Sequence, residues 1–152
     1  MTIIKVNLLL ALIAFSMNSF AALPREVKNL LNKDGEFISM VNGKNVNGEA
    51  GTDCRIIMNP YGGDESISIE SVAYFTPVAH MDNAKKEIKD GVTLFVLDDS
   101  GLRPGGSVGC GNTPQLSYKK TVEVRGSTLI IKQKFRCLLE RSTEIIQGCK
   151  IK

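Results

Sequence analysis

The sequence contains no tryptophan, a single histidine and no Cys-x-x-Cys pair. Zinc sites require Cys and His ligands clustered at characteristic spacings. His80 and four widely spaced cysteines do not provide such a cluster. The acidic pairs Asp64-Glu65 and Asp98-Asp99 lack the regularly spaced oxygen ligands of a calcium loop. We therefore expect neither a metal site nor a cofactor.

Long apolar runs are also scarce, and the longest lies at the N-terminus. Residues 6–15 form a short apolar segment behind Lys5, the only charge in the first 24 residues. Ser19 and Ala21 place small residues where a signal peptidase cuts. A membrane anchor is the alternative, but a span needs about 20 apolar residues and polar residues interrupt this run. We expect a signal peptide at residues 1–21, cleaved after Ala21 or, as second choice, Ala22, and hence a periplasmic or secreted protein.

What remains, residues 22–152, is long enough for one domain and contains no segment apolar enough to be a transmembrane helix. All four cysteines lie in this part: Cys54, Cys110, Cys137 and Cys149. An even number of cysteines in a small exported domain indicates two disulfides rather than free thiols.

The pattern of apolar residues predicts a mostly β fold. About seven short strands separated by turn signals, without a βαβ rhythm, indicate an antiparallel meander that closes as a small barrel or a sandwich. We expect one short helix in residues 23–31 and another in residues 82–90, capped by Asp82 and ended by Gly91. Residues 66–76 read as one strand with a bulge near Ser71, and residues 92–97 as a buried strand. The architecture resembles lipocalin-like barrels, but the Gly-x-Trp signature of that family is missing, so the resemblance implies no function.

Two hairpins follow from the C-terminal third. Apolar residues take even positions in residues 116–124 and odd positions in residues 129–139, so the loop between these strands must have an even length. Either a two-residue turn at Arg125-Gly126 or a four-residue turn at 125–128 satisfies this rule. The two-residue turn would place Lys119 opposite Lys132.

The second hairpin suggests how the cysteines pair. Inward-facing residues at odd positions on both of its strands require an odd loop, and centring that loop on Thr143 sets Cys137 opposite Cys149. We expect the disulfides Cys137–Cys149 and, by elimination, Cys54–Cys110. The other two connectivities stay open.

Catalytic patterns in the chain are weak. Ser107 lies in a Gly-x-Ser-x-Gly match, but the following residues 110–114 cannot start the helix that a nucleophile elbow needs. Ser100 with His80 and Asp98 or Asp99 can be drawn as a triad, yet the chain is too short for a two-barrel protease. We favour a surface histidine and a turn serine over a hydrolase, which remains the alternative function.

Charge is distributed unevenly. Residues 103–152 hold 10 Lys and Arg against 3 Asp and Glu, whereas residues 22–102 hold 8 against 13. Lys132, Lys134 and Arg136 alternate along one strand face, and Lys119 extends them into a candidate anion-binding stripe. The competing interpretation is a solvated face that prevents edge aggregation. No aromatic residues interleave with the stripe, and no nucleic-acid motif accompanies it.

From these features we expect an exported, non-catalytic binding or interaction protein. Its partner would be a small ligand inside the barrel, or an anionic surface or a protein that contacts residues 61–65 and 98–114. A small serine hydrolase and a structural component of the cell envelope are the two alternatives.

Overall fold

The computed structural model describes residues 23–45, 52–59, 66–78, 80–97 and 110–152. The expected signal peptide, residues 1–21, lies outside this part of the chain. The described residues form ten strands, one α-helix and one short 3-10 helix, so the protein is mostly β, as predicted. None of the described helices is long and apolar enough to cross a membrane.

The strands belong to a single antiparallel sheet with the order β5-β4-β3-β1-β10-β9-β8-β7-β6, to which β2 adds by pairing with β1. Their bounds are β1 Asp34–Val41, β2 Lys44–Asn45, β3 Asp53–Met58, β4 Ile67–Ser71, β5 Phe75–Val78, β6 Lys85–Lys89, β7 Val92–Leu97, β8 Gln115–Arg125, β9 Thr128–Cys137 and β10 Thr143–Ile151. The last strand in the sequence, β10, lies centrally between β1 and β9.

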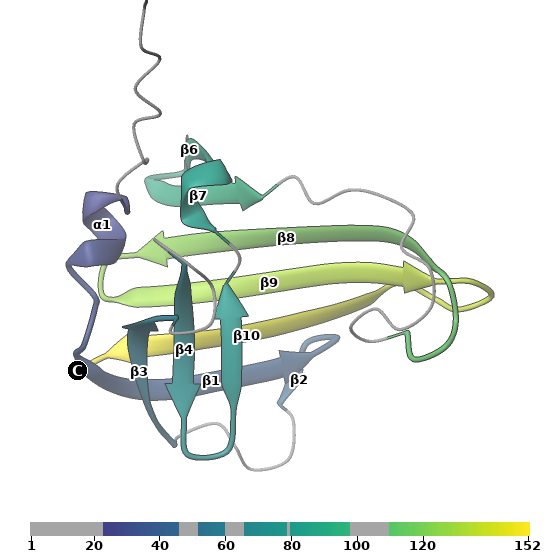
Figure 1. Ribbon diagram of the computed structural model, residues 1–152, viewed down its shortest axis with the longest axis horizontal. Helices are drawn as coiled ribbons and strands as arrows, with labels where there is room; N and C mark the ends of the chain where they lie inside the picture. The colour runs from purple at the N-terminus through teal and green to yellow at the C-terminus, as the bar shows by residue number, and fades with distance from the viewer. Residues whose placement is uncertain (1–22, 46–51, 60–65, 79, 98–109) are drawn as a thin grey trace, which may run out of the picture.

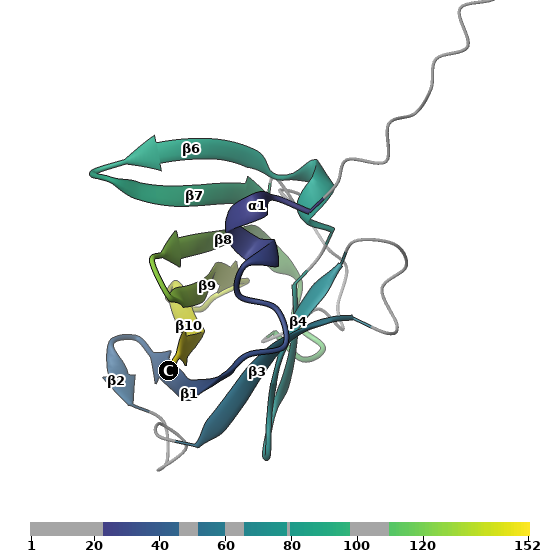
Figure 2. The same ribbon diagram turned by 90° about the vertical axis from the view of Figure 1, so that its left-hand side faces the viewer.

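The sheet curls into a half-barrel. In Figure 1, β8, β9, β10 and β1 run lengthwise, while β3 and β4 cross them. Figure 2 looks along the long strands and shows β6 and β7 at one side of the curl and β3 and β4 at the other. Alternate side chains point into the curl, and on β9 these are the odd-numbered residues from Leu129 to Cys137, all buried. The even-numbered residues of β9 point outward.

The helix α1 (Arg25–Lys28) completes the main core. Pro24 begins it with φ −53°, which suits a first turn, and Val27 is fully buried. Val27 and its neighbours Leu23 and Leu30 join one cluster with side chains from both halves of the curled sheet, including Phe37, Ile69 and Phe95. At about 25 cal/mol per Å² of apolar surface, this cluster provides most of the hydrophobic stabilisation.

The predicted helix at residues 82–90 is wrong. A 3-10 turn, η1 (Met81–Asn83), is followed by β6, which pairs with β7 in a hairpin. Asp90 and Gly91 connect the strands with φ values of +51° and +74°, as in a type I′ turn. Asp-Gly acts here as a hairpin turn rather than a helix end, because β7 offers a long pairing edge and the segment has few apolar residues to hold a helix in place.

The single bulged strand expected at residues 66–76 is a hairpin instead. β4 and β5 pair, with Glu70 opposite Phe75. Ser71 closes the turn: its hydroxyl accepts the Tyr74 N–H at 3.1 Å, and its own N–H donates to the Tyr74 carbonyl at 2.8 Å. The break in alternation after Ser71 therefore marks a turn.

In the β8–β9 hairpin, the predicted even loop length holds, and the register is that of the four-residue alternative, with Val124 opposite Leu129. Arg125 pairs with Thr128, so the turn is Gly126-Ser127, and Gly126 has φ +56°. Lys119 consequently faces Lys134, not Lys132.

The disulfide pairing predicted from the second hairpin is also wrong. β9 and β10 pair with Phe135 opposite Thr143, which centres their loop on Leu139 rather than Thr143 and sets Cys149 opposite Leu129. The disulfides are Cys54–Cys149 and Cys110–Cys137, with Cα–Cα distances of 5.9 and 5.6 Å.

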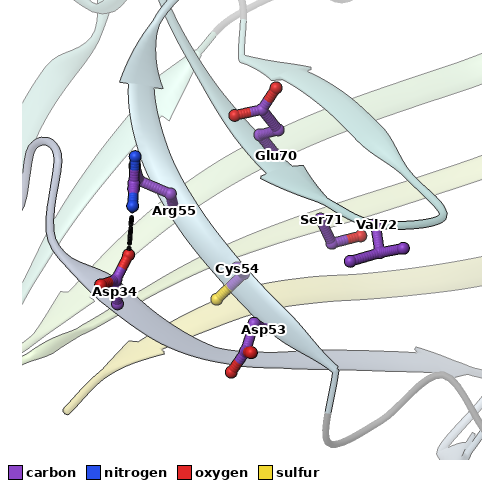
Figure 3. Close-up of a pocket in the computed structure, with 7 residues that line it drawn as sticks. All are labelled: Asp34, Asp53, Cys54, Arg55, Glu70, Ser71 and Val72. Atoms are coloured by element: carbon purple, nitrogen blue, oxygen red, sulfur yellow. Dashed lines mark hydrogen bonds and ion pairs between the residues drawn. The ribbon is translucent and has the colours of Figure 1, made fainter.

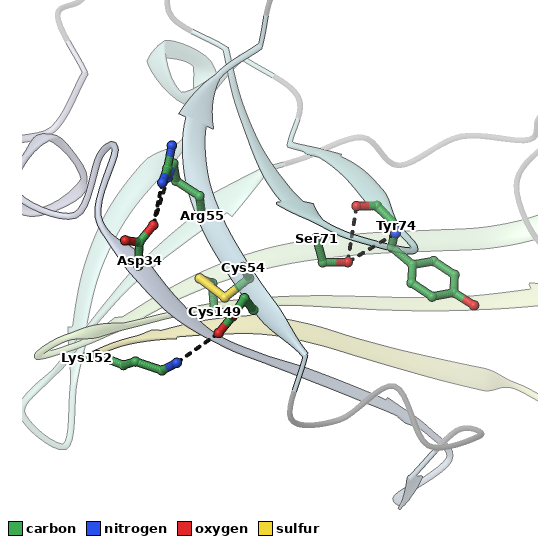
Figure 4. Close-up of a disulfide and its surroundings, with 8 residues drawn as sticks. Asp34, Cys54, Arg55, Ser71, Tyr74, Cys149 and Lys152 are labelled. Carbon is green, nitrogen blue, oxygen red and sulfur yellow. Dashed lines mark hydrogen bonds and ion pairs between the residues drawn. A yellow bond between two sulfur atoms is a disulfide. The ribbon is translucent and has the colours of Figure 1, made fainter.

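Cys54–Cys149 joins two strands, β3 and β10, that lie on either side of β1 (Figure 4). Gly35 of β1 lies opposite Cys54 and makes this approach feasible. A Cβ at Gly35 would come within 2.8 Å of the Cys149 Sγ atom and 2.6 Å of the Lys150 carbonyl oxygen. The glycine therefore lets the sheet fold sharply along β1.

Candidate functional site

The four candidate anion-binding residues all lie on the outer face of β8 and β9. Lys119, Lys134 and Arg136 are exposed, whereas Lys132 is half-buried. Lys119 and Lys134 are direct cross-strand partners, and Arg136 follows two residues along β9 on the same face. The sequence pattern therefore predicted that these side chains share a face, and their register is the one that the four-residue turn gives.

Lys132 has a different role from the other three. It forms an ion pair with Glu123, whose side chain is only 8% exposed and is also held by Arg125 at 2.8 Å. Burial raises the pKa of Glu123, but the hydrogen bonds from Lys132 and Arg125 outweigh burial, so the pKa lies below its usual range. Lys132 therefore neutralises a buried carboxylate and contributes little charge to solvent.

The remaining cations, Lys119, Lys134 and Arg136, are called the basic patch below. None of them forms an ion pair with any residue in the described part of the chain. Glu144 of β10 is the cross-strand partner of Lys134 on its other side, yet the two side chains are not paired. Like charges directly opposite each other destabilise a sheet. Repulsion between Lys119 and Lys134 therefore lowers the stability of the fold, and no described residue neutralises these charges.

A turn next to the basic patch presents two leucines to solvent. The Glu140 N–H donates to the Cys137 carbonyl at 3.2 Å, which makes Leu138 and Leu139 the central residues of a β-turn. Leu139 is 98% exposed and Leu138 42%. Sequence reasoning missed this turn and expected Leu139 to face inward, because the apolar alternation of β9 continues through it.

Leu139 adopts an unfavourable backbone conformation. Its φ is +67°, and the other non-glycine residues with positive φ in the described part of the chain are Asn or Asp: Asn32, Asn42 and Asp90. A positive φ at the third turn position with a negative φ before it defines a type II turn, which favours glycine there. A leucine at this position costs roughly 1–2 kcal/mol.

The turn is firmly anchored beneath the leucines. Cys137, its first residue, is bonded to Cys110, and the Leu138 N–H donates to the Pro114 carbonyl at 2.9 Å. Cys110, Cys137 and Phe135 form a small core of their own, separate from the main cluster. The leucines and Arg136 are therefore held in a defined geometry.

A second candidate site lies on the inner face of the half-barrel. A pocket of about 210 Å³ is lined by residues of β5, β8, β9 and β10 and by Tyr74 before β5. The Tyr118 hydroxyl lies 3.4 Å from Gln133 Oε1, and the Thr76 hydroxyl donates to Gln147 Oε1 at 3.0 Å. Tyr74 stacks on Phe37 with ring centroids 5.9 Å apart. Aromatic walls with a few amide and hydroxyl groups are typical of small-ligand pockets.

A third hollow, of about 300 Å³, lies beside the Cys54–Cys149 disulfide (Figure 3). Three of its four charged lining residues, Asp34, Asp53 and Arg55, form ion pairs. Arg55 and Asp34 point toward each other and pair at 2.5 Å, and Lys152 pairs with Asp53 at 2.8 Å. The hydrogen bond from Lys152 lowers the pKa of Asp53. This hollow therefore has little free charge with which to attract a ligand.

The catalytic candidates are only partly described. His80 is exposed and immediately precedes η1. Ser100, Ser107, Asp98 and Asp99 lie outside the described residues, as do residues 61–65. Within the described ranges, no three His, Cys, Asp or Glu side chains cluster in a way that could hold a metal ion.

Comparisons with known proteins add no name or activity. No protein-family model matches the sequence, and a search of curated proteins finds no match.

Proposed function

We propose that this protein is an exported, non-catalytic binding protein that recognises an anionic partner through the basic patch. One observation carries the proposal: Lys119 and Lys134 face each other across two strands, and no acidic side chain in the described part of the chain pairs with either. Because such an arrangement costs the fold stability, a partner that supplies negative charge is the simplest reason for retaining it. Two disulfides, typical of periplasmic and extracellular proteins, support the expected export.

The test compares two triple variants with the same net charge. Lys119→Gln/Lys134→Gln/Arg136→Gln removes the basic patch, whereas Lys33→Gln/Lys44→Gln/Lys85→Gln removes exposed lysines from other elements. On immobilised heparin, used as a generic polyanion, the patch variant should elute at clearly lower salt than wild type, and the control variant near wild type. Equal elution of the two variants would refute the proposal.

Export has its own measurement. The full chain expressed in a bacterium should yield a periplasmic or secreted product whose mass corresponds to a first residue of Ala22. A product that keeps residues 1–21 would contradict the expected cleavage.

The inner pocket supports a second candidate function, the binding of a small amphiphilic molecule. The observation in its favour is the set of amide and hydroxyl groups between Tyr74 and Tyr118. A compound found by thermal-shift screening should lose its effect in Gln133→Leu and keep it in the patch variant. A compound that stabilises wild type and Gln133→Leu equally does not bind in this pocket.

A further inference from the structure

The tip of the β9–β10 hairpin combines exposed apolar side chains with positive charge that no described residue pairs with. In Figure 1 this tip lies at the end of the molecule opposite α1. Leu139 projects with 98% of its surface exposed, beside the 42% exposed Leu138. Arg136 of the basic patch immediately precedes the turn, and Arg141, also exposed, follows it.

We propose that this tip docks on an anionic lipid bilayer, with Leu138 and Leu139 entering the boundary between headgroups and acyl chains and the basic patch contacting the headgroups. This inference rests on the proposed anion binding and names the partner. Apolar residues that enter the interface beside cations that reach the headgroups are the features that bind peripheral proteins to anionic membranes.

The shape of the tip favours a bilayer over a protein partner. A stable protein interface buries about 800 Å² on each side, and two leucines on a narrow turn provide far less apolar surface. A bilayer accepts a small projecting wedge, because lipids rearrange around it. A soluble polyanion could bind the basic patch but would leave the leucines in water.

The backbone conformation of Leu139 supports a functional role for its side chain. Its φ of +67° is one that glycine usually adopts, so the backbone of the leucine is strained. Its side chain is also exposed. The Cys110–Cys137 disulfide and the hydrogen bond from Leu138 to Pro114 fix the turn before any partner arrives. Less conformational freedom is then lost on docking, as expected for a pre-organised contact.

The acidic groups around the tip reduce its charge without cancelling it. Among the described residues, Glu140 lies in the turn and Glu144 is the second residue of β10, against the cations Lys119, Lys134, Arg136 and Arg141. The surroundings of the tip therefore stay positive, and we expect binding to weaken as salt rises.

The experiment measures co-sedimentation with vesicles of equal parts phosphatidylglycerol and phosphatidylcholine, and with vesicles of phosphatidylcholine alone. Leu138→Ser/Leu139→Gly removes the apolar wedge while giving the turn its preferred glycine, so the fold should persist. Val72→Ser is the matched control, since Val72 is 90% exposed in the β4–β5 turn. We expect the wedge variant to bind the anionic vesicles about tenfold more weakly than wild type and Val72→Ser, and to keep its elution from heparin.

The absence of tryptophan provides a direct probe of insertion. Leu139→Trp should shift its fluorescence emission to the blue when anionic vesicles are added, and Val72→Trp should not.

The outcomes separate the two proposals. Wild type that binds heparin but not anionic vesicles, or a wedge variant that binds vesicles as tightly as wild type, overturns the lipid inference and leaves anion binding intact. A patch variant with unchanged heparin elution overturns the proposed function itself. Equal binding to both kinds of vesicle would show that the negative charge of the headgroups plays no part in docking, and would overturn the inference of an anionic bilayer.

Discussion

The two ends of the half-barrel are stabilised in different ways. At the α1 end, the main core gathers side chains from the helix and from both halves of the sheet, and Cys54–Cys149 joins strands on either side of β1. At the hairpin end, a small core of Cys110, Phe135 and Cys137 lies below a turn that exposes two leucines. The first end is organised for stability. The second has a strained leucine and cations without ion-pair partners among the described residues, and the fold alone requires neither.

Removal of each disulfide should give the largest difference in stability between the two ends. Chain-entropy reasoning gives about 4.7 kcal/mol for the Cys54–Cys149 loop and about 3.6 kcal/mol for the Cys110–Cys137 loop, which span 95 and 27 residues. Urea unfolding of Cys54→Ala/Cys149→Ala and Cys110→Ala/Cys137→Ala checks the order. Only the second pair should also weaken vesicle binding, because it releases the turn. If the Cys110–Cys137 variant were the less stable, the order expected from loop length would be wrong.

Glu123 lies between the two ends, and its contribution to the stability of the fold should depend on pH. Its pKa is lower in the folded chain than in the unfolded chain, so the ionised carboxylate stabilises the fold above the unfolded pKa. This contribution, about 1 kcal/mol after allowing for the partly exposed Lys132, is lost as the pH falls through the folded pKa. The stability of wild type and Glu123→Gln, measured by urea unfolding, should differ at neutral pH and converge in acid. A difference in stability that stays constant with pH would show that ionisation of Glu123 does not cause it.

The smallest effect on the fold should come from Leu139→Gly. Relief of the positive φ favours the folded state by roughly 1–2 kcal/mol, and the added freedom of glycine in the unfolded chain offsets about 0.5–1 kcal/mol of it. The melting temperature should stay constant or rise slightly, while vesicle binding falls. A clear drop in melting temperature would show that Leu139 packs against the protein and is not held ready for a partner.

The sequence was sufficient for features that depend on local alternation. The mostly β fold, the N-terminal helix and the facing directions on β8 and β9 follow from the spacing of apolar residues and the chemistry of turns. The basic patch was found in the same way.

Features that depend on pairing between distant segments could not be predicted from the local spacing of apolar residues. A loop centre displaced from Leu139 to Thr143 was enough to exchange the disulfide partners, because apolar residues in a turn look like the continuation of a strand. Asp90-Gly91 suits both a helix end and a hairpin, and only the pairing with β7 decides between them. The exposed leucines were missed for the same reason: local pattern assigns apolar residues to the inside.

The central position of β10 has a consequence for how the chain acquires its disulfides. Cys54 and Cys110 emerge first during synthesis or export, yet the native partner of Cys54 lies on the last strand, which must be complete before the sheet can close between β1 and β9. A chain oxidised as it emerges would join Cys54 to Cys110. That bond must exchange through a mixed disulfide before folding can finish. Refolding yield should therefore depend on a thiol–disulfide shuffling system.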